Sequence, residues 1–271
     1  MQEATRRARM RLMNPWTIGV PLVGAAALGM AAYAAAVPQA QLFGPTIRHT
    51  DQGRKLAITF DDGPNPAITP KLLDLLEKYN AKATFFVIGR FVRECPSLVK
   101  EIAARGHVIG NHTETHPMLA LLGPQETREE LERCSDAILH AVWAKPVFFR
   151  PPYGLRNPWV GQTAARMGMK VVMWTLIPGD WRATSSEWLI PRLGPIAERA
   201  KRHLAATGSG SAATNGPAST GDILCLHDGA HRQLNADRLP TLAALEHWLP
   251  RWRDLGLEFV TIDDAVSTPA T

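Results

Sequence analysis

Short apolar runs and longer amphipathic stretches alternate along most of the chain. The apolar runs are rich in β-branched and aromatic residues, which is typical of buried strands. The first of them, Leu-Ala-Ile-Thr-Phe, also shows the alternation of a strand. We therefore predict about seven strands, at residues 56–60, 83–89, 107–112, 147–150, 170–174, 223–227 and 258–262.

The stretches between these runs place apolar residues at the spacing of an amphipathic helix. Strands that alternate with helices indicate βα units, and such units build a parallel sheet or a barrel. The number of strands favours a barrel, so we predict an α/β fold with a barrel of about seven strands. The helices are expected at residues 70–79, 98–105, 125–143, 158–167, 187–205 and 239–254.

An uncharged apolar segment precedes this body. Residues 15–37 comprise 23 residues without a charge, which is enough to cross a bilayer as a helix. Trp16 lies at its start, where interfacial aromatic residues are common. The tail 1–14 is basic, and the positive-inside rule places such a tail in the cytoplasm and the following chain outside. Its basic residues are Arg6, Arg7, Arg9 and Arg11.

Two interpretations of residues 15–37 stay open. The length favours an uncleaved signal anchor, which would hold the protein in the cytoplasmic membrane with a single transmembrane helix. The small residues near 33–36 are compatible with a cleavable signal peptide, which would release a secreted or periplasmic protein. Both interpretations place the body of the chain outside the cytoplasm.

The rest of the chain divides into a connector and one domain. Residues 38–54 form a polar linker in this interpretation. Residues 55–266 are enough for one core, in a chain of 271 residues with 45% apolar content. The low-complexity segment 205–222 is expected to be a flexible loop within that domain.

Charge and cysteine content exclude some classes of protein. The formal net charge is +5, but much of the excess lies in the N-terminal tail, so we expect no nucleic-acid partner. Nothing in the sequence indicates an obligate protein partner. Three cysteines do not make a disulfide scaffold. Cys95 and Cys134 could pair in an oxidising compartment, although free thiols are the simpler interpretation.

Polar groups cluster where the predicted strands end. Asp61 and Asp62 follow the first strand directly, and two adjacent carboxylates there are costly unless they are solvated, paired or bound to a cation. The sequence Asp-Asp-Gly-Pro-Asn-Pro is also typical of a turn that caps a helix. This motif alone supports both interpretations about equally.

Two histidines four residues apart follow the third strand. On a helical turn, His112 and His116 could face one metal ion, and Asp62 could supply a third ligand. Such a set leaves one coordination position open for water, as in catalytic zinc sites. Glu114 lies between the histidines, so we expect it to point elsewhere and to be solvated or outside the ligand set.

Three further clusters end later strands. Arg150 is followed by two prolines that fix the backbone, Asp180 and Trp181 follow the fifth strand, and His227 ends the sixth. Each could be structural when taken alone, as an ordinary turn or a hydrogen-bonded histidine. Because the carboxyl ends of the strands of a βα barrel gather on one face, we expect all five clusters to share one rim.

Together these clusters resemble the five ordered motifs of the NodB-type polysaccharide deacetylases, which form carbohydrate esterase family four. The resemblance covers residues 55–266, and it implies a distorted (β/α) barrel with seven strands. The motifs are Thr-Phe-Asp-Asp-Gly-Pro at 59–64, His-Thr-Glu-Thr-His at 112–116, Arg-Pro-Pro-Tyr-Gly at 150–154, Asp-Trp at 180–181 and Leu-His-Asp at 226–228.

The resemblance implies a role for each residue of the first motifs. Asp61 matches the catalytic base of the family, and Arg150 matches the residue that orients it. Asp62, His112 and His116 match the ligands of one divalent metal ion, usually zinc, although cobalt or another divalent ion also serves.

The later motifs imply the groups that handle the substrate. The backbone N–H of Tyr153 matches the donor to the developing oxyanion, and Trp181 matches a wall of the acetyl pocket. His227 matches the general acid, and Asp180 matches its partner. Cys225 occupies the position that lines the methyl pocket, where the family usually has leucine.

One further position departs from the family pattern. Ile177 lies where many members have aspartate, three residues before the Asp-Trp pair. The resemblance implies removal of N-acetyl groups from an extracytoplasmic polysaccharide, such as peptidoglycan or a chitin-like glycan. Two alternatives are an esterase acting on O-acetyl groups, as on xylan, and a non-catalytic glycan-binding relative. The second would be expected to carry a broken motif.

Overall fold

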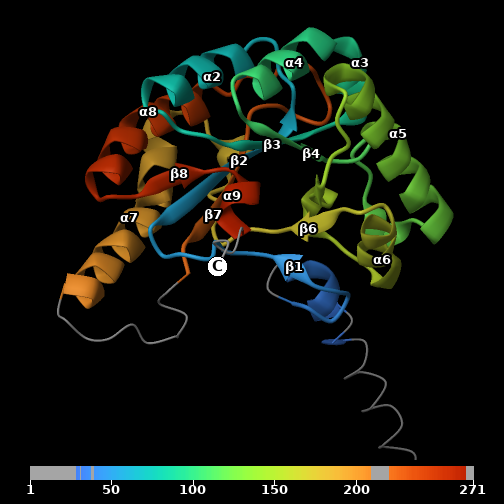
Figure 1. Cartoon of the computed structure of the whole chain (residues 1–271), viewed down its shortest axis with the longest axis horizontal. Helices are drawn as coiled ribbons and strands as arrows, with labels where there is room; N and C mark the ends of the chain where they lie inside the picture. Colours follow the sequence, from blue (N-terminus) through green and yellow to red (C-terminus); the bar gives the residue numbers. More distant parts are fainter. Residues whose placement is uncertain (1–28, 31, 38–39, 209–219, 267–271) are drawn as a thin grey trace, which may run out of the picture.

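The computed structural model describes residues 29–30, 32–37, 40–208 and 220–266. Parallel strands occupy the centre of the molecule, and helices surround them (Figure 1). The strand order is β1-β6-β5-β4-β3-β2-β7, and β8 also pairs with β2. The strands are β1 (Thr46–Ile47), β2 (Lys55–Gly63), β3 (Thr84–Val87), β4 (Val108–Asn111), β5 (Phe148–Phe149), β6 (Lys170–Val172), β7 (Asp222–His227) and β8 (Glu258–Val260).

The chain just after β6 brings the two ends of the sheet together. The Thr175 N–H donates to the Ile223 carbonyl at 2.9 Å, and the Cys225 N–H donates to the Leu176 carbonyl at 2.9 Å. These bonds join β7 to the segment that follows β6. On its other side, β7 pairs along its length with β2. The arrangement is consistent with a distorted (β/α) barrel, because only a few hydrogen bonds make this last connection.

The helices begin where the sequence favours it. Five of them, α2, α4, α5, α6 and α8, have proline in the first turn, where the missing N–H costs no hydrogen bond. The helices are α2 (Thr69–Lys78), α3 (Gly89–Glu94), α4 (Pro96–Ala104), α5 (Pro124–Val142), α6 (Pro158–Arg166), α7 (Ser186–Gly208), α8 (Leu239–Asp254) and α9 (Ile262–Val266).

Every strand and helix that the sequence predicts in the body is present, with small changes of boundary. The structure adds β1, α3 and α9, which are too short for a hydrophobic period to be visible in the sequence. Helix α7 continues to Gly208, into the start of the predicted loop 205–222, and residues 209–219 lie outside the described residues.

The domain boundaries stay a prediction. All three cysteines are free thiols.

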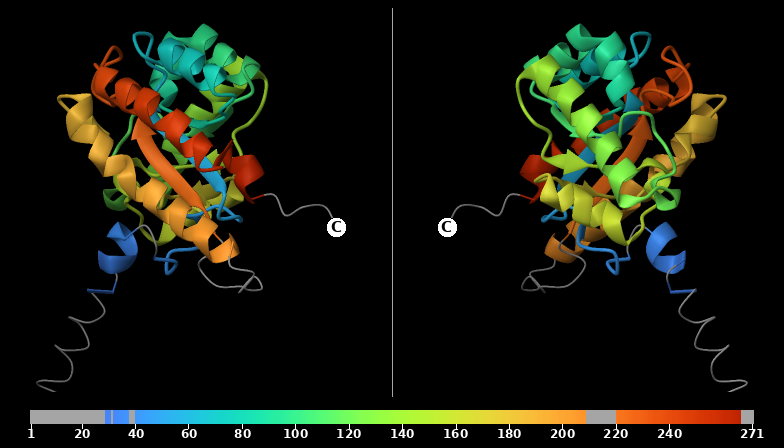
Figure 2. Two further views of the ribbon diagram at one scale, coloured as in Figure 1. Left: turned by 90° about the vertical axis from the view of Figure 1, so that its left-hand side faces the viewer. Right: turned by 90° about the vertical axis from the view of Figure 1, so that its right-hand side faces the viewer.

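The predicted N-terminal span is only partly described. Residues 1–28 lie outside the described residues, and among the described ones no helix has the length and apolar content needed to cross a membrane. Residues 32–36 form the end of a helix, in which Ala34 is buried. Figure 2 shows this segment in blue, at the same end of the molecule as the C-terminal end of α7.

A single arginine connects this N-terminal segment to the barrel. The Arg156 guanidinium donates to the carbonyls of Val37 at 2.7 Å and Ala40 at 3.0 Å. The Arg156 N–H donates to the Ala35 carbonyl at 3.0 Å. Burial lowers the pKa of this guanidinium. Arg156 therefore ends the helix of residues 32–36 in the way that a cationic side chain at a helix C-terminus does.

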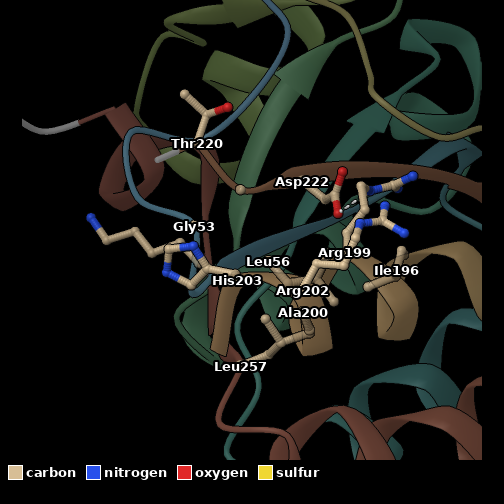
Figure 3. A pocket seen from close by; sticks show the side chains of 12 residues that line it. Gly53, Leu56, Ile196, Arg199, Ala200, Arg202, His203, Thr220, Asp222 and Leu257 are labelled. Carbon is tan, nitrogen blue, oxygen red and sulfur yellow. Dashed lines mark hydrogen bonds and ion pairs between the residues drawn. The ribbon is translucent and has the colours of Figure 1, made fainter. Parts of the chain in front are cut away.

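A small cavity of about 320 Å³ lies at the amino ends of β2 and β7 (Figure 3). Its charged lining is partly paired, since Arg199 Nε donates to an Asp222 carboxylate oxygen at 2.8 Å. Asp61 and His227 end these same two strands, so their chemistry lies at the opposite end of the barrel. None of the residues that carry the sequence motifs lines this cavity.

Replacing Arg156 tests the contact with the N-terminal segment. We expect Arg156→Met to lower the free energy of unfolding by roughly 2–4 kcal/mol, because two carbonyls lose charged donors. The measurement is denaturant unfolding of the purified chain. Arg166→Met, on the exposed side of α6, is the matched control and should change stability by less than about 0.5 kcal/mol. Equal effects of the two substitutions would contradict this role.

Candidate active site and metal centre

The five predicted clusters converge at the carboxyl ends of the strands. Asp61 and Asp62 lie at the end of β2, and His227 ends β7. The other motifs follow β4, β5 and β6. They surround one cavity of about 830 Å³. Its lining includes Asp61, Asp62, His112, His116, Tyr153, Trp181 and His227. The prediction of a shared rim is confirmed.

The three predicted ligands form a compact group. One ligand atom from each of Asp62, His112 and His116 lies within 4.8 Å of the other two. Asp62 Oδ1 is 3.5 Å from His112 Nε2 and 3.2 Å from His116 Nε2. This oxygen is buried and has no hydrogen-bond partner among the described residues. Such an oxygen is costly to bury, and a divalent cation would satisfy it. The residues therefore fit the predicted metal ion.

The histidines reach this arrangement without a helical turn, so that part of the prediction is wrong. Thr113 and His116 both have a left-handed backbone, with φ of 69° and 63°. The turn is held by side chains, because Asn111 Oδ1 accepts from the Thr113 N–H and Thr113 Oγ1 accepts from the His116 N–H. Local polar contacts, and not helical spacing, direct the two rings to one point.

The orientation of His112 and the charge of His116 suit metal binding. His112 Nδ1 lies 2.8 Å from the Arg150 carbonyl, so it donates there and leaves Nε2 free to face Asp62. Burial, followed by the charge of His112, lowers the pKa of His116 to about 3. His116 is therefore neutral at pH 7 and can offer a lone pair. Burial raises the pKa of Asp62, but the neighbouring imidazoles outweigh it and hold this pKa well below its usual range.

Glu114 is buried, so of the two expectations from sequence, solvated or outside the ligand set, the second applies. Its carboxylate is buried and forms ion pairs with Arg93 and with Arg133, the second at 3.6 Å. These arginines come from α3 and α5. The left-handed residues on either side turn Glu114 away from the metal group and toward these helices. It is outside the ligand set, as expected.

Asp61 is held by a buried arginine. Arg150 is fully buried, and its Nη1 donates to Asp61 Oδ1 at 2.7 Å and to Thr59 Oγ1 at 2.6 Å. The carbonyl of Met173 accepts from Nη2 at 3.1 Å. The second carboxylate oxygen of Asp61 lies 3.4 Å from Cys225 Sγ. Asp61 is therefore an oriented carboxylate beside the metal group.

His227 and Asp180 form a second pair, in which Asp180 is buried and His227 is partly buried. Asp180 Oδ1 is 2.9 Å from His227 Nδ1, and Oδ2 accepts from the His227 N–H at 2.8 Å. Thr241 Oγ1 donates to Oδ2 at 3.2 Å. Burial lowers the pKa of His227, but the charge and hydrogen bond of Asp180 outweigh burial and raise it to about 9. His227 is therefore a cation at neutral pH and carries a proton that it can donate.

Aromatic rings line the open part of the cavity. Tyr153 and Trp181 are exposed there, and each makes an edge contact with a histidine of the site. Ile177 lines the cavity at the position where the family often has aspartate. Cys225 is fully buried beneath Asp61 and is not among the lining residues. Its assignment to the methyl pocket stays a prediction, as do the individual catalytic roles.

One residue of the site was missed by the sequence analysis. The ring of His231 stacks on that of His116, with centroids 4.4 Å apart and planes at 12°. Its Nδ1 is 3.8 Å from Asp62 Oδ2, and its Nε2 is 3.5 Å from the Tyr153 hydroxyl. The sequence signal was only a second histidine four residues after His227. Nothing in that spacing shows that the loop folds back onto the metal group.

Comparison with known proteins agrees with this geometry. Residues 48–172 match the polysaccharide deacetylase family. A peptidoglycan-N-acetylglucosamine deacetylase of Bacillus cereus is 37% identical over 212 residues, which cover 77% of this chain and 86% of that protein. The chain belongs to the polysaccharide deacetylases, carbohydrate esterase family four.

Two further relatives extend the comparison. A chitooligosaccharide deacetylase of Azorhizobium caulinodans is 32% identical over 216 residues, which cover 77% of this chain and 93% of that protein. The solved structure of the Bc1960 peptidoglycan N-acetylglucosamine deacetylase has a TM-score of 0.66 and 29% identity. That alignment covers 82% of this chain and 92% of the other. Peptidoglycan and chitin oligomers are therefore both represented among the relatives.

The pair of His227 and Asp180 predicts a measurable pH dependence. In the metal-free protein, the imidazole of His227 should titrate near pH 9, above the ordinary value of 6.5. Asp180→Asn should bring this pKa down toward or below 6.5, because burial remains after the attraction is removed. Histidine NMR signals followed against pH make the measurement.

The same pair contributes to stability with a definite sign. Because folding raises the pKa of His227, its contribution is fully present below pH 6.5 and is lost as the pH rises through about 9. The difference in unfolding free energy between wild type and Asp180→Asn should shrink over that window. An unchanged His227 titration in the variant would contradict the assignment.

Proposed function

We propose that this chain is a metal-dependent hydrolase that removes N-acetyl groups from an extracytoplasmic glycan containing N-acetylglucosamine. The observation that carries the proposal is a buried oxygen of Asp62 that has no hydrogen-bond partner among the described residues and lies close to two imidazole nitrogens. Beside it lie Asp61 and His227, each oriented by a charged partner. Members of the family act on such glycans, and the relatives include deacetylases of peptidoglycan and of chitooligosaccharides.

Asp62, His112 and His116 would hold the metal ion, for which zinc suits the ligands best and cobalt is an alternative. Bound there, a divalent ion supplies Lewis-acid chemistry that polarises the acetyl carbonyl and acidifies the attacking water. The closeness of Asp62 Oδ1 to both imidazole Nε2 atoms supports this ligand set.

Two side chains would move protons in opposite directions. Asp61 accepts the proton of the attacking water, and Arg150 keeps its carboxylate oriented. His227 enters the reaction protonated and gives its proton to the departing sugar amine, while Asp180 stabilises the imidazolium. The backbone N–H of Tyr153 is assigned to the developing oxyanion, and Trp181 to a wall beside the acetyl group.

The location outside the cytoplasm rests on the sequence. The basic tail 1–14 and the uncharged segment 15–37 support export through, or attachment to, the cytoplasmic membrane. Polymeric acetylated glycans of the cell envelope are found on that side of the membrane. The proposed topology therefore agrees with the proposed substrate.

Two substitutions separate metal binding from proton transfer. Asp61→Asn should lower kcat by about 10²–10⁴, because the base is lost while the ligands remain, and the metal content should stay near that of wild type. His112→Ala should lose both activity and metal, since one of three ligands is gone. Acetate release and metal content by mass spectrometry are the measurements. Full turnover by either variant would contradict the role assigned to the substituted residue.

Acetate release from a panel of substrates tests the reaction itself. We expect the purified full-length chain in detergent to release acetate from N-acetylglucosamine-containing glycans. Chelator should stop the reaction, and added zinc should restore it. Release only from O-acetylated xylan would establish the esterase alternative. No release from any substrate, with the metal bound, would favour a non-catalytic glycan-binding protein.

A further inference from the structure

The rim of the active-site cavity is rich in arginine. Arg182 comes from the 3-10 turn Asp180–Arg182, and Arg232 and Arg238 come from the loop between β7 and α8. Arg182 and Arg232 are exposed. The carboxylate on this rim is Asp237, and its Oδ1 accepts from the Leu239 N–H at the start of α8. Three cationic groups thus face one carboxylate that already has a donor.

The buried carboxylates of the site do not neutralise these arginines. Asp61 pairs with Arg150, Asp180 pairs with His227, and Asp62 faces the histidines. No carboxylate of the described residues lies within ion-pair distance of Arg182, Arg232 or Arg238. The charges deep in the cavity are therefore matched locally, whereas the positive charge of the rim is not.

Neutral groups contact two of these guanidinium groups. Arg238 Nε donates to the Gly229 carbonyl at 2.8 Å, and Nη1 donates to the Asp237 carbonyl at 3.2 Å. The Arg182 guanidinium lies 5.9 Å from the centre of the Trp181 ring, on the wall of the cavity. The two hydrogen bonds hold Arg238 beside the cavity without cancelling its charge, and the Trp181 ring leaves the charge of Arg182 in place.

We propose that Arg182, Arg232 and Arg238 form a binding site for carboxylate groups carried by the glycan. The enzyme would then prefer an anionic glycan, whose sugars bear a carboxylate, over a neutral oligomer of N-acetylglucosamine. This inference rests on the proposed function, because it concerns the substrate of that same site. A planar guanidinium matches a carboxylate with two parallel hydrogen bonds, which gives geometric selectivity as well as attraction.

A neutral glycan cannot replace the water molecules that hydrate these arginines with partners of equal strength. An exposed arginine is well hydrated, and contact with an uncharged sugar would replace water by weaker partners. A carboxylate instead gains from the positive charges that line the same cavity, and the attraction also raises the rate of encounter. Because these contacts are partly exposed, salt should screen them.

The test uses one matched pair of substrates. The first is a peptide-free strand of alternating N-acetylglucosamine and N-acetylmuramic acid, in which the second sugar carries one carboxylate. The second is the same strand with that carboxylate converted to the neutral methylamide. The full-length protein in detergent is loaded with zinc, and kcat/KM for acetate release is compared at low and high salt.

We expect wild type to prefer the anionic strand by about five- to thirtyfold at low salt, mainly through KM, and to lose much of this preference at high salt. In Arg182→Gln, Arg232→Gln and Arg238→Gln, each ratio of the two kcat/KM values should fall about two- to fivefold, and the triple variant should approach a ratio of one. Arg192→Gln, an exposed arginine of α7 that stacks on Trp188, is the control and should keep the wild-type ratio.

Direct binding keeps the two proposals distinguishable. Calorimetry of the two strands with the metal-free protein measures the rim without turnover, and the same preference is expected there. Equal use and equal binding of both strands by wild type would overturn the arginine site while leaving the deacetylase intact. An equal loss on both strands in the variants would overturn it too. Preferential binding without any acetate release would instead defeat the proposed function alone.

Discussion

Two adjacent carboxylates at the end of a buried strand are the constraint on which this site depends. Asp61 and Asp62 are 4% and 6% exposed, so water cannot stabilise their charges. The fold supplies a different partner to each. Arg150 holds Asp61 through a direct ion pair, whereas Asp62 faces two imidazole nitrogens and keeps one oxygen without a donor. Neighbouring residues of the same type thereby acquire different environments, which suit the proposed roles of a base and of a metal ligand.

The barrel explains how these partners come together. Arg150 follows β5 and reaches Thr59 on β2 across the interior, and backbone carbonyls at the end of β6 accept its remaining hydrogen bonds. Its carbonyl in turn accepts from His112, so one residue orients both the proposed base and a proposed metal ligand. Asp180 acts in a similar way on His227 through side chain and backbone. Residues distant in the chain are coupled through a few buried hydrogen bonds, and their burial makes those bonds strong.

Much of the fold could be predicted because its signals are local. Strand 56–60 and helix 125–143 carry clear periodicities, and Asp61, His112, Arg150 and His227 each lie at or just beyond the end of a strand. The elements that were missed, such as α3, are too short to show a period. The course of the His112–His116 turn was also missed, because side-chain contacts of Asn111 and Thr113 decide it. His231 was missed since its proximity to Asp62 depends on how an irregular loop folds back.

The sequence by itself determined the order of strands and helices and the identity of the chemical groups at the strand ends, because alternation and motif spacing are properties of neighbouring residues. Only the tertiary structure decided that Glu114 is buried in ion pairs, that Cys225 lies beneath Asp61, and that three arginines without a carboxylate partner among the described residues line the cavity. Those outcomes depend on which surfaces meet when the barrel forms. Burial and charge neutralisation depend on contacts between segments that are distant in the chain, so they cannot be predicted from any one segment.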